Sequence, residues 1–202
     1  MRMIAAHIPG YTYGTAAVAT SPIPPHDLDV LKQAAGFTDE DERSLRLAGA
    51  VLADQTADLV ARWRGVLAAE PRLAQYSLGP NGQPDPHYSG DSGLRFQQWV
   101  LDTCLRPYDQ DWLNYQQEIA LRHTSLKKNK TDGVASAPFI PLRYILAFAA
   151  VVNETIKPFL AAKGHPADEV AKMHHAWCKA VQLQMALGSE PYTDTTLAPN
   201  EW

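Results

Sequence analysis

The sequence predicts an all-α fold, on three observations. Apolar residues recur at spacings of three and four over long stretches, residues that favour helix starts precede those stretches, and the alternation typical of strands is absent. The chain has 202 residues, of which 46% are hydrophobic and 20% are charged. This composition is typical of one sizeable folded domain and unlike that of a disordered chain.

Each expected element follows from local composition. Residues 8–25 are rich in Pro, Gly and aromatic residues, which predicts an extended arm because proline and glycine interrupt helices. Thr38, which three acidic residues follow, is a predicted helix start. Helices are expected over 26–36, from 38 to just before Pro71 as one long helix or two end to end, and over 88–105, 109–123, 141–164 and 166–187, with polar connections over 77–86 and 126–137.

The predicted helix over 141–164 differs from the others in its apolar character. Residues 144–152 are almost continuously apolar, which predicts burial on most sides of the helix. Pro158 lies inside the same helix and is expected to kink it. The most apolar part, 142–152, is too short to span a bilayer, and the N-terminus has too short an apolar run for a signal peptide. A cytoplasmic location, with no membrane partner, is therefore the expectation.

Charge and cysteine content exclude several classes of protein. The formal net charge of -4 gives no basis for binding nucleic acid or an anionic membrane. The cluster of Lys127, Lys128 and Lys130, beside a helix end, is expected to be a solvated face or a partner of the helix dipole rather than a binding site. Cys104 and Cys178 are too few for a disulfide framework and are expected to be reduced and buried.

His123 is the residue whose position raises a functional question. At about 100° per residue, it lies about 20° around its helix from Trp112 and about 40° from Ile119, so it shares the inward-facing stripe. From periodicity alone, a hydrogen-bonded histidine in the core or at its rim is the commoner outcome, and a metal ligand is the alternative. One histidine cannot build a structural zinc site, whereas haem needs only one protein ligand. His174 and Cys178, four residues apart, supply only half a metal site.

Five segments together resemble the protoglobins, which are single-domain relatives of globin-coupled sensors. They are IPGYTYG (8–14), RFQQWVLDTC (95–104), YDQDWLNYQQEIALRH (108–123), KKNKTD (127–132) and KPFLAAKGH (157–165), and the resemblance spans about residues 7–192. It implies a globin-like helical sandwich with an extra N-terminal helix. The implied organisation is an N-terminal extension over 1–25 that covers the haem edge, a globin domain over 26–192 and a tail over 193–202.

The resemblance also implies a haem b site, residue by residue. His123 falls on the proximal histidine that binds the iron, and Trp63 falls on the distal tryptophan. Phe96 and Phe148 fall on aromatic residues that close over the distal side and wall the pocket. The other implied cofactor contacts are Arg95 near a propionate, Tyr115, Ile145 and Val152.

Arg64 departs from the family pattern, in which a tyrosine follows the distal tryptophan. Arginine is longer, always cationic and unable to accept a hydrogen bond. The side chain could donate to a distal ligand of the iron, pair with a propionate or swing outward. A propionate or surface partner is the favoured outcome, because an unpaired buried guanidinium is costly.

The leading functional hypothesis is a haem protein that reversibly binds O₂, CO or NO, as a gas sensor or scavenger. One alternative is a haem enzyme acting on NO, nitrite or peroxide, or an engineered carbene or group-transfer catalyst; no catalytic residue is assigned. The other is a haem-free globin-fold signalling module. The resemblance further implies a homodimer formed through the last two long helices, about 141–187.

Overall fold

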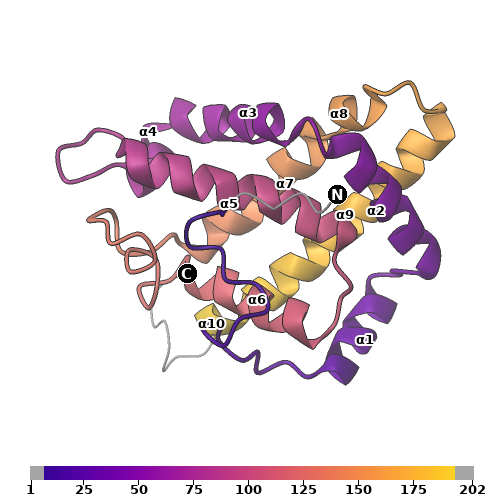
Figure 1. Ribbon diagram of the computed structural model, residues 1–202, viewed down its shortest axis with the longest axis horizontal. Coiled ribbons are helices and arrows are strands. Elements are labelled where there is room, and N and C mark those ends of the chain that lie inside the picture. Colours follow the sequence, from indigo (N-terminus) through magenta and orange to yellow (C-terminus); the bar gives the residue numbers. More distant parts are fainter. Residues whose placement is uncertain (1–6, 194–202) are drawn as a thin grey trace.

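The chain is built from helices, which confirms the predicted all-α class (Figure 1). The computed structural model describes residues 7–193, and within them the only β-type pairing is one isolated bridge between Leu78 and Pro84. The predicted segment 1–25 and tail 193–202 therefore lie partly outside the described residues. The elements are α1 Pro25–Ala34, α2 Asp39–Leu52, α3 Thr56–Ala69, α4 Pro71–Ala74, the 3-10 turn η1 Gln75–Ser77, α5 Pro86–Leu105, α6 Gln110–Leu121, α7 Leu142–Thr155, α8 Lys157–Ala161, α9 Ala167–Gly188 and α10 Glu190–Thr193.

Helix starts follow side-chain caps that the sequence carries. Thr38 and Asp41 form a reciprocal capping box at the start of α2. Asp85 accepts backbone hydrogen bonds at the start of α5, and Asp109 accepts one from the Trp112 N–H at the start of α6. These caps satisfy N–H groups that have no partner inside the helix, and so fix where each helix begins.

Two of the predicted helices are each divided in the structure. The segment from 38 to 70 forms α2 and α3, which a short turn separates, as the two-helix alternative expected. The segment from 141 to 164 forms α7 and α8, with the break at Ile156. Pro158 explains this break, because it lacks the N–H that would bond the carbonyl four residues earlier. The kink expected at this proline is confirmed.

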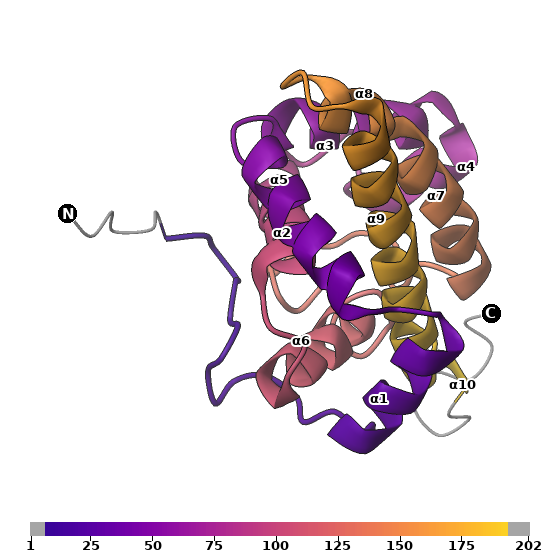
Figure 2. The same ribbon diagram turned by 90° about the vertical axis from the view of Figure 1, so that its right-hand side faces the viewer.

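Helix α9 lies at the centre of the packing. It contacts α2, α7, α6, α8 and α5, and Figure 2 shows it upright between α2 and α7. The main core gathers around Trp63, Trp177 and Leu52, which are fully buried. A smaller cluster around Trp112 and Leu28 joins α6 to α1. A cavity lies beside this core, between α3, α5, α6 and α7.

The prediction that 144–152 is buried on most sides is wrong for the single chain. Val152 and Ala149 point into the core, but Leu146 is 37% exposed and Ala147 and Ala150 are also exposed. Apolar composition alone cannot distinguish a core face from an outward apolar face.

The 20-residue segment Leu142–Ala161 is long and apolar enough, by composition and length only, to cross a membrane. This segment is longer than the eleven residues, 142–152, that were expected from sequence to be too short to span a bilayer. One such segment is weak evidence for a membrane span, because the core helix of a soluble protein meets the same criteria.

The two cysteines differ in how deeply they are buried. Both thiols are free, but only Cys104 is buried, so the expectation of burial is wrong for Cys178. The Cys178 sulfur lies 3.6 Å from His174 Nε2, which in turn lies 2.8 Å from the Asn153 carbonyl oxygen. Within residues 7–193, no group of three or more His, Cys, Asp or Glu side chains is placed to hold a metal ion. The pair is a local contact that completes no metal site.

Candidate functional site

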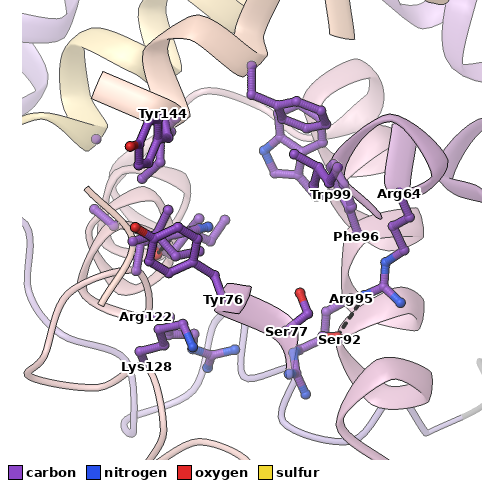
Figure 3. A pocket seen from close by; sticks show the side chains of 18 of the residues that line it. Arg64, Tyr76, Ser77, Ser92, Arg95, Phe96, Trp99, Arg122, Lys128 and Tyr144 are labelled. Carbon is purple, nitrogen blue, oxygen red and sulfur yellow. Dashed lines mark hydrogen bonds between the residues drawn. The ribbon is translucent and has the colours of Figure 1, made fainter. Parts of the chain in front are cut away.

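A cavity of about 630 Å³ opens between α3, α5, α6, α7 and the turns that follow α6 (Figure 3). This volume is within the range of about 300–1,000 Å³ typical of sites for cofactors and small molecules. Most of its lining is apolar, and Phe96, Trp99, Ile145, Phe148 and Val152 contribute to it. We call α6 and the turns to residue 132 the α6 wall, and the helix pair α3 and α5 the α3–α5 wall.

His123 lies in the turn directly after α6 and lines the cavity. Its Nδ1 lies 2.8 Å from the carbonyl oxygen of Ile119, one turn back, and its own carbonyl accepts a hydrogen bond from the Ile140 N–H. Nδ1 must carry the proton to donate to that carbonyl, so Nε2 keeps its lone pair. Nε2 makes no hydrogen bond to any residue within 7–193.

The electrostatic surroundings of His123 keep the ring neutral. Burial lowers its pKa, and the nearby positive charges of Lys128 and Arg122 lower the pKa further, against the opposing effect of the bond to Ile119. A neutral imidazole with one fixed tautomer is the form that binds a metal ion. The arrangement therefore fits a single histidine ligand better than a histidine satisfied on both nitrogens.

Trp63 does not line the cavity, in contrast to the distal position that the resemblance implies. Its indole is fully buried, and Nε1 donates to Thr155 Oγ1 at 2.8 Å. The ring packs behind Phe96 and Trp99, at centroid distances of 5.1 and 6.2 Å. Phe96 and Trp99, rather than Trp63, form the apolar surface of the α3–α5 wall.

Arg64 reaches from α3 across to α5 and lines the cavity. Its guanidinium donates to the carbonyl of Ser89 and, at 2.7 Å, to Ser92 Oγ (Figure 3). Gly93 makes room for it, because a Cβ there would lie 3.2 Å from Nη1. Of the three outcomes left open from sequence, the outward swing is not observed, because the side chain bonds to two uncharged oxygens of α5 beside the cavity.

Arg95 and Arg122 hold the N-terminal arm beside the cavity. Arg95 makes a two-pronged ion pair with Asp132, at 2.9 and 2.6 Å, and also donates to the Pro9 carbonyl. Arg122 pairs with Glu118 and donates to the carbonyl of Gly10. Figure 2 shows the arm running past α6 toward α1.

At Gly10 the backbone of the arm lies so close to Arg95 that a side chain would require a neighbouring group to move. Gly10 has a φ of +70°, and a Cβ there would lie 2.7 Å from Arg95 Nη1. Tyr115, which lines the cavity, packs edge-on against Tyr11 and Tyr13 of the arm at 5.3 Å each. The arm and the cavity wall are therefore one packed unit.

Lys128 is buried, so the expectation of a solvated lysine cluster is wrong at this position. It is 3% exposed and lines the cavity, whereas Lys127 pairs with Glu118 and Lys130 is exposed. The turns after α6 fold back under the cavity and carry Lys128 with them. No periodicity in the sequence marks a residue in such turns as inward-facing.

Comparisons with known proteins identify the family and the fold. The family model described as Protoglobin matches residues 25–197. The chain belongs to the protoglobin family. No significant match was found among curated protein sequences.

The fold of this protoglobin is also found in a solved structure. The globin domain of the Geobacter sulfurreducens globin-coupled sensor superposes with a TM-score of 0.61 at 16% identity, covering 82% of this chain and 97% of that domain. At this level of identity the likeness shows a globin fold and nothing about ligands.

The structure brings together most of the predicted site residues of the protoglobin chain. Eight of them line one cavity: His123, Arg64, Arg95, Phe96, Tyr115, Ile145, Phe148 and Val152. Sequence reasoning missed the polar residues Lys128, Tyr88 and Gln116. The only available signal was for Gln116, which lies seven residues before His123 and so on the same face of α6.

Proposed function

We propose that this protoglobin binds haem b in the cavity, with His123 Nε2 as the one protein ligand to the iron. The observation that carries the proposal is a neutral, oriented imidazole that lines an apolar space of about 630 Å³ and whose Nε2 has no hydrogen-bond partner within residues 7–193. A haem-free signalling module offers no role for an imidazole that is oriented at the wall of a largely apolar cavity.

Bound haem supplies an iron atom whose remaining coordination position takes O₂, CO or NO. The chain's own residues set the conditions for that binding. The Ile119 carbonyl holds the His123 ring and increases its basicity by accepting from Nδ1. Phe96, Trp99 and Phe148 give the space an apolar lining, which disfavours water beside the ligand and so would slow oxidation of the ferrous form.

Reversible gas binding is the function that the lining favours over peroxide chemistry. Efficient peroxide cleavage uses a distal acid–base residue, most often histidine. Of the described residues that line the cavity, His123 is the one histidine, and it is the residue assigned to the iron. A role as sensor or scavenger then depends on partners outside the cavity.

The outward apolar face of α7 supports a homodimer, which the resemblance also implies. Leu146, Ala147 and Ala150 present small and apolar side chains to solvent. Burying such a face against a second copy removes apolar area from water.

The absorption spectrum of the purified, haem-supplied protein tests the proposed function. We expect an intense Soret band that shifts on addition of CO to the reduced protein. His123→Ala is expected to lose most of the haem, whereas the control His87→Ala, at an exposed histidine, retains it. Full haem occupancy and an unchanged spectrum in His123→Ala would contradict the assignment of the iron ligand.

A further inference from the structure

The cavity carries more positive charge than its own carboxylates neutralise. Four cationic side chains line it: Arg64, Arg95, Arg122 and Lys128. Arg95 pairs with Asp132, and Arg122 pairs with Glu118. Arg64 and Lys128 have no carboxylate partner within residues 7–193, so two positive charges remain at the cavity.

Lys128 is the more unusual of the two unpaired cations. Its ammonium is buried, and its only hydrogen-bond contacts among the described residues are long, at 3.5 Å to Asn129 Oδ1 and 3.4 Å to Ser136 Oγ. The Tyr88 ring lies 5.6 Å away and offers a weak cation–π contact. Burial lowers the pKa of Lys128 to about 8, so the group is still mostly protonated at pH 7. A buried ammonium with such weak acceptors is costly unless a further anion approaches it.

Arg64 is the second unpaired cation, and it lies near the same tyrosine. Its two hydrogen-bond acceptors within residues 7–193, the Ser89 carbonyl and Ser92 Oγ, are both uncharged. Burial and the charge of Asp132 raise the pKa of Tyr88, whereas the positive charges of Arg95 and Arg64 lower it. The Lys128 ammonium lies over the ring of the same tyrosine. Figure 3 shows Lys128 on one side of the cavity and Arg64, above Ser92, on the other. The two cations therefore face a common space.

We propose that Lys128 and Arg64 bind the two carboxylates of a planar, dianionic cofactor, and that Arg95 and Arg122 serve instead to hold the N-terminal arm. This inference rests on the proposed haem function and names the residues that receive the propionates. It differs from the expectation for Arg95, whose terminal nitrogens are already bonded to Asp132 and Pro9. Two uncompensated charges match a ligand of charge −2 without rearrangement of the existing ion pairs.

The inference predicts that one substitution raises the thermal stability of the haem-free protein but lowers the affinity for haem. Lys128→Met keeps the length and burial of the side chain but removes its charge. We expect the haem-free protein to become more stable to heat, because an unpaired buried charge is lost. We expect the affinity for haem to fall by roughly ten- to hundredfold, because a charge-assisted hydrogen bond is lost. Lys130→Met, at an exposed lysine of the same turn, is the matched control and changes neither quantity.

Arg64→Met should lower the affinity for haem by a similar factor, with exposed Arg62→Met as its control on the same helix. Iron protoporphyrin IX dimethyl ester, which lacks both carboxylates, separates charge recognition from shape. The wild-type protein should bind the ester more weakly than haem, and neither Lys128→Met nor Arg64→Met should weaken ester binding further. Titrations followed at the Soret band measure all of these affinities.

The outcomes separate this inference from the function on which it rests. If the wild-type protein takes up no haem, the proposed function itself fails. If His123→Ala loses haem while Lys128→Met and Arg64→Met bind it as tightly as wild type, only the carboxylate assignment is overturned. If Lys128→Met lowers both the thermal stability of the haem-free protein and its affinity for the ester, Lys128 is a structural residue and the inference is wrong.

Discussion

The two walls of the cavity are held together in different ways. On the α6 wall, His123 is fixed by a hydrogen bond to Ile119, only four residues away in the sequence. On the α3–α5 wall, Trp63 is fixed by Thr155, which is 92 residues away, and Arg64 by Ser92, which is 28 residues away. The first wall depends on local backbone geometry, and the second depends on how distant helices pack.

This difference separates the two residues that the resemblance assigns to the iron site. The local geometry of the α6 wall brings His123 to the lining of the cavity. The α3–α5 wall presents Phe96 and Trp99 to the cavity, with Trp63 in a second layer behind them. Variants at residues behind or beside each wall can therefore test whether contacts in the two walls contribute differently to the free energy of unfolding.

Removal of the Trp63 side chain is expected to have the largest effect on stability. Trp63→Ala deletes a fully buried indole that packs against Phe96, Trp99 and Trp177, so the free energy of unfolding should fall by about 3–5 kcal/mol. Urea denaturation of the haem-free protein measures this loss in the free energy of unfolding. Val66→Ala, at a 41% exposed position of the same helix, is the control and should change the free energy by less than about 0.5 kcal/mol. A loss below about 1 kcal/mol for Trp63→Ala would mean that the second layer is not a packed core.

The same contrast explains what the sequence could predict. The helix caps Thr38 and Asp109, the break at Pro158 and the carbonyl partner of His123 all depend on neighbours in sequence, and each was predictable. The burial of Lys128 depends on how the turns after α6 fold back, and no periodic pattern encodes that path.

The position of Trp63 and the exposure of Leu146 were unpredictable for a related reason. Both are apolar residues on helices, and periodicity says only that such residues prefer some partner to water. Whether the partner is a cavity, a second layer or another chain is set by long-range packing. The proposal that His123 binds the iron came from the family resemblance, because periodicity alone had left the role of this residue open.

The pH dependence of stability should report the buried charge on the α6 wall. The pKa of Lys128 is lowered to about 8 in the folded state, against about 10.4 in an unfolded chain. Between these values the unfolded chain binds more protons than the folded one, so the free energy of unfolding rises as the pH increases from about 8 to about 10.4. The gain should be on the order of 3 kcal/mol, and below pH 8 the full destabilisation persists.

The difference between wild type and Lys128→Met isolates this contribution, because the tyrosines and cysteines titrate in both proteins. We expect the variant to be the more stable at pH 7 and its advantage to shrink by pH 10.4. Denaturation curves of the two haem-free proteins at half-unit pH steps provide the measurement. Parallel stability curves over this interval would show that Lys128 is solvated and does not place an unpaired buried charge on the α6 wall.

Thr155→Val is expected to have the smallest effect, and it tests the hydrogen bond that anchors the second layer. Valine keeps the shape of threonine but removes Oγ1, which accepts from Trp63 Nε1 at 2.8 Å and donates to the Val151 carbonyl. A buried indole N–H without its acceptor should lower the free energy of unfolding by about 1–2 kcal/mol. Trp63→Phe removes the donor, so in a double-mutant cycle the Thr155→Val loss should shrink when phenylalanine is present. An undiminished loss in that background would mean that Thr155 acts through the end of α7 instead, and that packing alone holds the α3–α5 wall.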